Sequence, residues 1–159
     1  NAARMAHEES SHVAKKIRDE AIKGGHNLIF DGTGNKIDSY HGMIKKLKEQ
    51  GYHVNVIMAD VDADVGIARA KARAEKTGRD VPEDFARTAY KRIPANFEPI
   101  AHEADDFALY NNHPKGKGEQ RLVYARTAGQ DQVIDRPYLD AFRANKPRKE
   151  ISEQGKKRY

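Results

Sequence analysis

An acidic residue and two glycines at the end of an apolar run make residues 27–36, NLIFDGTGNK, a candidate ligand site. Asp31 ends the run, and Gly32 and Gly34 flank Thr33 directly after it. In open parallel sheets ligands bind beyond the carboxyl ends of strands, where an acid can hold Mg²⁺ or its water. The segment GTGNK is too short for a phosphate-binding P-loop, which needs four residues between its first glycine and a Gly-Lys pair. Alternatively, Asp31 only caps a turn in which the glycines supply positive φ angles. These residues alone leave both interpretations open.

Three arginines form the second candidate group. Arg69 and Arg73 are four residues apart and share a face of a predicted helix, and Arg79 follows a glycine in the loop before Pro82. Guanidinium groups near a mobile loop can stabilise the charge that develops during phosphoryl transfer. The alternative is a solvated basic helix face, which is the usual reading of an isolated arginine pair.

The hydrophobic pattern predicts alternating helices and strands around these residues. Such alternation is typical of an α/β protein with a parallel sheet covered on both faces. The predicted helices cover 5–23, 37–50, a segment from Asp62 or Asp64 to Gly78, a segment opening at Pro82, and a short one from Asp135; the predicted strands cover 27–31, 52–60, 106–112 and 120–126, with 113–119 as a turn.

Composition limits the function classes. The length of 159 residues favours one domain, and the sequence has neither an 18-residue apolar run nor a signal-peptide pattern. Zero cysteines fit a reducing compartment, so we expect a cytoplasmic protein without a membrane partner. Residues 146–159 carry six basic and two acidic residues, which is +4 of the net charge of +5. We expect them to form a disordered, solvated tail and do not expect a nucleic-acid partner. The seven scattered histidines are expected to be solvated.

The order of these motifs resembles the zeta toxin family of P-loop kinases over roughly residues 5–112. The stretches that carry the resemblance are HEESSHVAKKIRDEAIKGGHNLIFDGTGN, GYHVNVIMAD, RAKARAEKTGRDVP and ADDFALYNN. It implies an ATP-dependent phosphotransferase that uses Mg²⁺ and acts on a hydroxyl of a small molecule, such as the nucleotide sugar UDP-N-acetylglucosamine. An antitoxin is the partner that it implies.

The resemblance also implies roles for single residues. Thr33 matches the residue that contacts the acceptor, and Asp31 matches the acid two positions before it, a candidate for Mg²⁺ binding through water. Arg73 and Arg79 match the arginines on the nucleotide phosphates, and Arg69 is a further candidate there. Lys15 departs from the family pattern, since some members have an acidic acceptor-binding residue there, so the acceptor is expected to differ.

In the family the P-loop and the catalytic aspartate lie upstream of the helix that begins here near Met5. We therefore expect residues 1–145 to form a kinase domain without its N-terminal P-loop segment, with a C-terminal hairpin extension, followed by the tail 146–159. Upstream residues or another chain would have to complete it, and the chain alone would be inactive. The alternative is a non-catalytic kinase-like module of a larger toxin or phage assembly.

Overall fold

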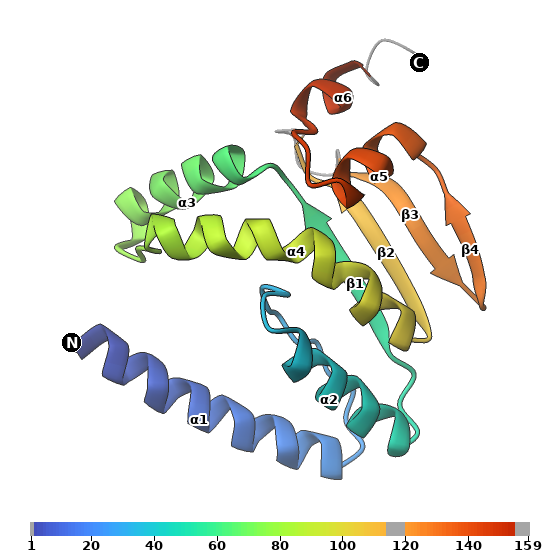
Figure 1. Cartoon of the computed structure of the whole chain (residues 1–159). Helices are drawn as coiled ribbons and strands as arrows, with labels where there is room; N and C mark the ends of the chain where they lie inside the picture. Colours follow the sequence, from blue (N-terminus) through green and yellow to red (C-terminus); the bar gives the residue numbers. More distant parts are fainter. Residues whose placement is uncertain (1, 114–119, 155–159) are drawn as a thin grey trace. The chain divides into compact units, whose positions relative to one another are not determined.

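The computed structural model describes residues 2–113 and 120–154 and divides the chain into two units, Asn1–Gly32 and Thr33–Tyr159. The first unit contains helix α1, Ala2–Lys23 (Figure 1). This helix ends where the sequence predicts, because Gly25 adopts a left-handed φ of 68° and the His26 amide closes onto the Ala21 carbonyl at 3.0 Å.

The strand predicted at residues 27–31 is not formed, so this prediction was wrong. The segment has no regular secondary structure, and its apolar side chains are exposed, with Ile29 fully so. Phe30 has a cation-π contact, with the Arg18 guanidinium 6.0 Å from its ring centroid. An apolar run becomes a strand only where a neighbouring strand accepts its hydrogen bonds, and no strand in the described ranges pairs with it.

The second unit combines a sheet with helices, and the prediction of an α/β fold is confirmed (Figure 1). Its elements are α2 (Ile37–Glu49), β1 (Asn55–Asp60), α3 (Ala63–Thr77), α4 (Glu83–Glu103), β2 (Asp106–Asn111), β3 (Arg121–Thr127), β4 (Gln130–Val133), α5 (Arg136–Arg143) and α6 (Lys149–Gln154). None of the helices in the described ranges is long and apolar enough to cross a membrane.

The sheet has the strand order β1-β2-β3-β4 and is mixed, because it combines a parallel pair with the hairpin predicted at residues 106–126. Strands β1 and β2 pair in parallel, whereas β3 is antiparallel to both of its neighbours. The turn between β3 and β4 explains the last pairing, because Ala128 and Gly129 both have positive φ, 50° and 78°, as a two-residue hairpin turn requires. The predicted turn at 113–119 lies outside the described residues except for His113.

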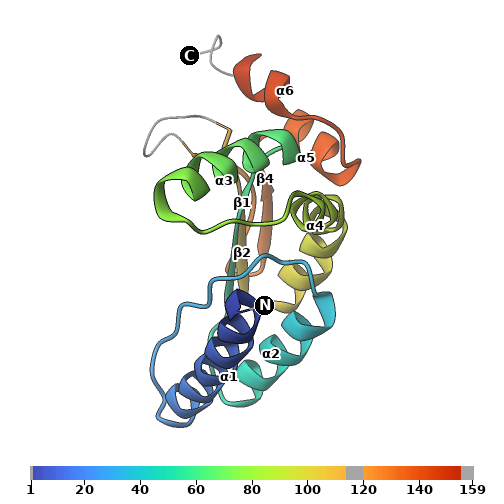
Figure 2. The ribbon, with the colours of Figure 1, turned by 90° about the vertical axis from the view of Figure 1, so that its left-hand side faces the viewer.

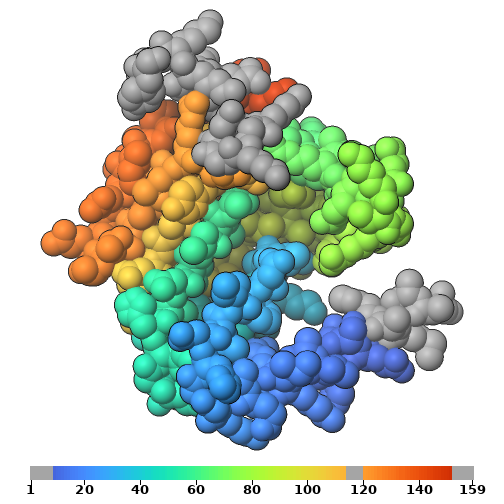
Figure 3. All heavy atoms as spheres, turned by 180° about the vertical axis from the view of Figure 1, so that it is seen from behind, coloured from blue at the N-terminus to red at the C-terminus, as the bar shows by residue number. Residues whose placement is uncertain are grey.

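The core lies between the sheet and helices α4 and α5, which occupy the same side of the sheet in Figure 2. Phe97 of α4 makes edge-to-face contacts with Phe107 of β2 and Phe142 of α5, with ring centroids 6.0 and 5.8 Å apart. On the opposite face Ile57 of β1 is 73% exposed, and strands β1 and β2 reach the surface in the view of Figure 3. The described part of the second unit therefore covers one face of its sheet more fully than the other.

The prediction of a disordered tail from residue 146 was wrong for residues 146–154. Helix α6 forms within this segment, and Arg148 is only 4% exposed. A basic run is typical of solvated chain when no acid inside the fold can pair with it, but here Arg148 pairs with buried Asp60 and half-buried Asp62. Residues 155–159 lie outside the described part of the chain.

Candidate functional site

The loop that contains Thr33 is fixed by hydrogen bonds from two helices. The Gly34 amide donates to the Tyr40 hydroxyl of α2 at 3.0 Å. The Asn96 side chain of α4 donates to the carbonyls of Gly34 and Asn35 at 3.0 and 3.2 Å. Gly34 has a φ of 70°, which favours glycine. Thr33 is exposed, so the loop presents its hydroxyl next to a backbone held in one conformation.

Asp31 lies in the first unit and is exposed. Within the described ranges, no group of three or more His, Asp or Glu side chains is arranged to hold a metal ion. A single carboxylate is compatible with Mg²⁺ that keeps most of its waters and takes its other ligands from phosphate oxygens. The magnesium role of Asp31 stays a prediction.

Helix α3 and the turn after it position the three arginines. Asp62 is the N-cap residue, and the helix ends at Gly78, which has a left-handed φ of 70° and donates to the Ala74 carbonyl at 2.7 Å. Pro82, with φ of −55°, then precedes α4. The predicted helix boundaries are confirmed, and they leave Arg79 in a short turn between two helices.

The three arginines differ in what their guanidinium groups contact. Arg69 donates to the carbonyls of Asn112 and His113 at 2.8 and 3.1 Å and so attaches α3 to the segment after β2. Arg73 and Arg79 are exposed, and no side chain among the described residues pairs with either guanidinium. Because no described side chain occupies them, the guanidinium groups of Arg73 and Arg79 can bind an anion, whereas Arg69 already has a structural function. The nucleotide-binding roles of all three stay predictions.

Contacts with α4 hold α3 in place. Arg87 of α4 pairs with Asp64 of α3 and with Glu83, both through hydrogen bonds of 2.9 Å. Lys71 of α3 pairs with Glu83 at 2.7 Å, and hydrogen bonds from Lys71 and Arg87 lower the pKa of Glu83. These exposed pairs each contribute little to stability, but together they restrict how α3 and α4 move against each other.

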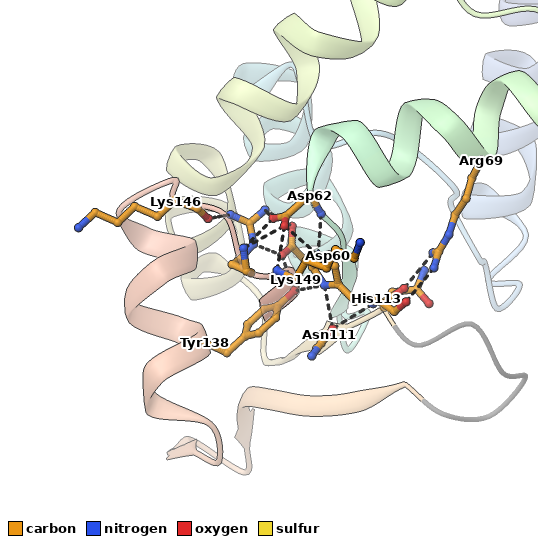
Figure 4. A network of polar contacts seen from close by, with 10 residues as sticks. Asp60, Asp62, Arg69, Asn111, His113, Tyr138, Lys146 and Lys149 are labelled. Carbon is orange, nitrogen blue, oxygen red and sulfur yellow. Dashed lines mark hydrogen bonds and ion pairs between the residues drawn. The ribbon is translucent and has the colours of Figure 1, made fainter. Parts of the chain in front are cut away.

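A buried polar network lies at the carboxyl end of β1 (Figure 4). Asp60, the last residue of β1, faces Arg148, and the Arg148 Nε lies 2.7 Å from Asp60 Oδ2. Because the Nε–H is not aligned for a hydrogen bond, this contact is an ion pair. The Tyr138 hydroxyl donates to the same oxygen at 2.8 Å. Burial raises the pKa of Asp60, and the Arg148 charge opposes that rise.

His113 connects this network to the start of α3. The Asp62 amide donates to His113 Nε2 at 3.0 Å, and His113 Nδ1 lies 3.0 Å from Asn111 Oδ1 and 3.1 Å from the Tyr138 hydroxyl. An accepting Nε2 requires the neutral imidazole with its proton on Nδ1. Burial lowers the pKa of His113, in agreement with this form.

The prediction of solvated histidines was wrong for His113, which is 8% exposed. Sequence reasoning also missed Tyr138 and Arg148. The signal that could have indicated them is the pair Asp60 and Asp62 at the end of an apolar strand, because acids that are buried or half-buried there need a cation or hydrogen-bond donors from elsewhere in the chain.

Comparison with known proteins gives one family match. A family model described as Zeta toxin matches residues 1–128. No curated protein and no solved structure matches the chain. The matched range runs from α1 through β3 and includes Thr33 and all three arginines, but it excludes β4, α5 and α6.

Proposed function

Because the chain belongs to the zeta toxin family, we propose that it forms part of an ATP-dependent kinase that transfers a phosphoryl group to a hydroxyl of a small molecule. Family membership supports kinase-type phosphoryl transfer in general. The observation that carries the proposal for this chain is that Arg73 and Arg79 are exposed on a helix and turn that other contacts hold in place, and that no side chain in the described ranges pairs with their guanidinium groups.

The proposed task of Arg73 and Arg79 is electrostatic. Charge spreads over the transferring phosphoryl group in the transition state, and fixed guanidinium groups stabilise it without reorganising at the moment of reaction. Two acids of these helices do not compete for the guanidinium groups, because Glu83 is already paired with Lys71 and Asp64 with Arg87.

Thr33 is the proposed contact to the acceptor. Its exposed side chain follows directly on Gly32 and precedes the loop that Tyr40 and Asn96 hold. We propose a nucleotide sugar such as UDP-N-acetylglucosamine as the acceptor class, with Asp31 binding Mg²⁺ through water. When bound, Mg²⁺ would neutralise charge on the ATP phosphates.

We further propose that the loop that cradles the ATP phosphates and the base that activates the acceptor hydroxyl come from residues upstream of Asn1 or from another chain. The chain alone would then be inactive. An antitoxin that blocks the nucleotide site is the proposed protein partner, and the reducing cytoplasm is the proposed compartment.

The experiment that tests this function is transfer of a labelled γ-phosphate. The full reading frame of the gene and residues 1–159 alone are each incubated with labelled Mg-ATP and a panel of nucleotide sugars, and labelled products are separated and counted. We expect a labelled nucleotide sugar only with the full reading frame. The absence of any labelled acceptor in both samples would favour the non-catalytic module instead.

A further inference from the structure

We propose that Arg148 is a positioning residue that holds helix α3 in the orientation its phosphate-binding arginines need. The inference rests on the proposed function, because it assigns Arg148 a role in the action of Arg73 and Arg79. Arg148 contacts neither of them in the described structure, so its effect would pass through α3.

The first step concerns the start of α3. Asp62 occupies the N-cap position, yet its side chain makes no cap hydrogen bond to the helix. Its carboxylate instead accepts the Arg148 and Lys149 amides at 2.9 Å each, and the Arg148 guanidinium lies 3.3 Å from Oδ1. The beginning of α3 is therefore bound to a segment 86 residues further along the chain.

The second step is that α3 is attached at another point to the same network. The Asp62 amide donates to the His113 ring, and Arg69, farther along α3, donates to the His113 carbonyl. Two attachment points along one helix limit its rotation as well as its position. Arg73 is one turn beyond Arg69, so the direction of its side chain depends on both.

The third step concerns charge. Asp60 is buried and Asp62 is half-buried, and Arg148 is the guanidinium in the described ranges that contacts both carboxylates. Without it two neighbouring carboxylates would lose their counter-charge, and their repulsion would act directly on the residue that begins α3. A shift of about 1 Å in a group that positions reacting atoms can lower turnover about 100-fold.

One side of this arrangement belongs to a part of the chain that the family match does not include. Arg148 and the helix that carries Tyr138 both follow residue 128, where the match ends. The network therefore joins the C-terminal segment of this chain to the helix that carries the predicted phosphate ligands.

The test compares Arg148→Lys and Arg148→Ala with Arg143→Gln in the full-length protein. Arg143 offers a matched control, because it belongs to the same C-terminal segment and pairs with Glu98 of α4 at 2.6 Å, away from α3. Hydrogen exchange of peptides from α3, α2 and α5 reports how firmly α3 is held, independently of activity. The values of kcat and KM for ATP report the consequence for catalysis.

We expect both Arg148 variants to exchange faster in α3 than wild type, with α2 unchanged, and to lose about 10- to 100-fold in kcat with little change in KM for ATP. The Lys variant retains one charge and should be the milder, which keeps the test valid if the Ala variant does not fold. Arg143→Gln should match wild type in both measurements.

Three results would overturn the inference. The first is unchanged exchange in α3, and the second is faster exchange in α3 with unchanged kcat. Uniformly faster exchange in every helix would also overturn it, because Arg148 would then serve overall stability only. If wild type itself transfers no phosphate, the proposed function fails, and α3 exchange alone then decides whether Arg148 holds the helix.

Discussion

The close contact between Gly66 of α3 and Tyr90 of α4 gives a prediction about the free energy of unfolding, and the sign of the effect depends on Tyr90. A Cβ atom added at Gly66 would collide with the Tyr90 hydroxyl and ring carbon Cζ and would lie 3.1 Å from Cε2. Gly66 is buried, and its own amide donates to the Asp62 carbonyl at 3.0 Å, so the backbone cannot easily move away. Gly66→Ala should therefore force Tyr90 out of its place between the helices.

Two opposing terms set the size of this effect. Alanine favours a helix interior by about 1 kcal/mol relative to glycine. Overpacking a close contact costs about 1–3 kcal/mol, and because a displaced Tyr90 also loses buried area we expect the upper part of that range. The net result should be a loss of about 1–2 kcal/mol in the free energy of unfolding.

The assay is urea unfolding followed by far-UV circular dichroism, since the chain has no tryptophan. Gly42→Ala in α2 is the matched control, because a Cβ there would meet no atom within 4 Å, and it should stabilise by about 0.5–1 kcal/mol. In a Tyr90→Ala background Gly66→Ala should become stabilising as well. If Gly66→Ala stabilises the wild-type chain as Gly42→Ala does, the close packing of α3 on α4 is refuted.

Two further predictions concern the pH dependence of stability and a helix cap. Burial lowers the folded-state pKa of His113 below 6.5, so the unfolded chain binds more protons below that pH, and the free energy of unfolding should fall as the pH drops from about 7 through 6.5. His113→Gln should lack this component when urea unfolding is compared at about pH 7.5 and pH 5.5, and an identical pH slope in the variant would contradict the assignment. Asp135 is the N-cap of α5 and accepts the Tyr138 amide at 3.0 Å, so Asp135→Ala should lower the free energy of unfolding by about 1 kcal/mol. The control Asp140→Ala removes an exposed carboxylate of α5 and should change the free energy of unfolding little. Equal losses in the two variants would argue against the cap.

Local sequence signals predicted the part of the site that local interactions build. Gly78 ends α3 through its own left-handed φ, so its residue type suffices to predict that end, whereas Asp62 lies at the start of α3 but makes no cap hydrogen bond to the helix. Asp135 predicted the start of α5, where its side chain accepts the Tyr138 amide. The α/β class also followed from periodicity, because burial of one helix face or one strand face leaves a regular pattern.

Contacts between distant parts of the chain could not be predicted in this way. The apolar run at 27–31 has the composition of a strand, but strand formation depends on a neighbour that composition does not reveal. Strand β4 was missed because the polar residues Gln130, Asp131 and Gln132 show no apolar alternation. Arg148 was assigned to a solvated tail because its partners Asp60 and Asp62 lie 88 and 86 residues earlier.

The measurement that tests the central claim most directly is the turnover of Arg79→Ala in the full-length protein, with Mg-ATP and acceptor at saturation. We expect kcat to fall about a thousandfold, because a well-placed guanidinium acts mainly in the transition state of phosphoryl transfer. The free energy of unfolding should stay near wild type, since Arg79 is exposed in a turn. Arg92→Ala, which removes an exposed arginine of α4, should leave both quantities near wild type. An Arg79→Ala enzyme within a few fold of wild-type turnover would contradict the account.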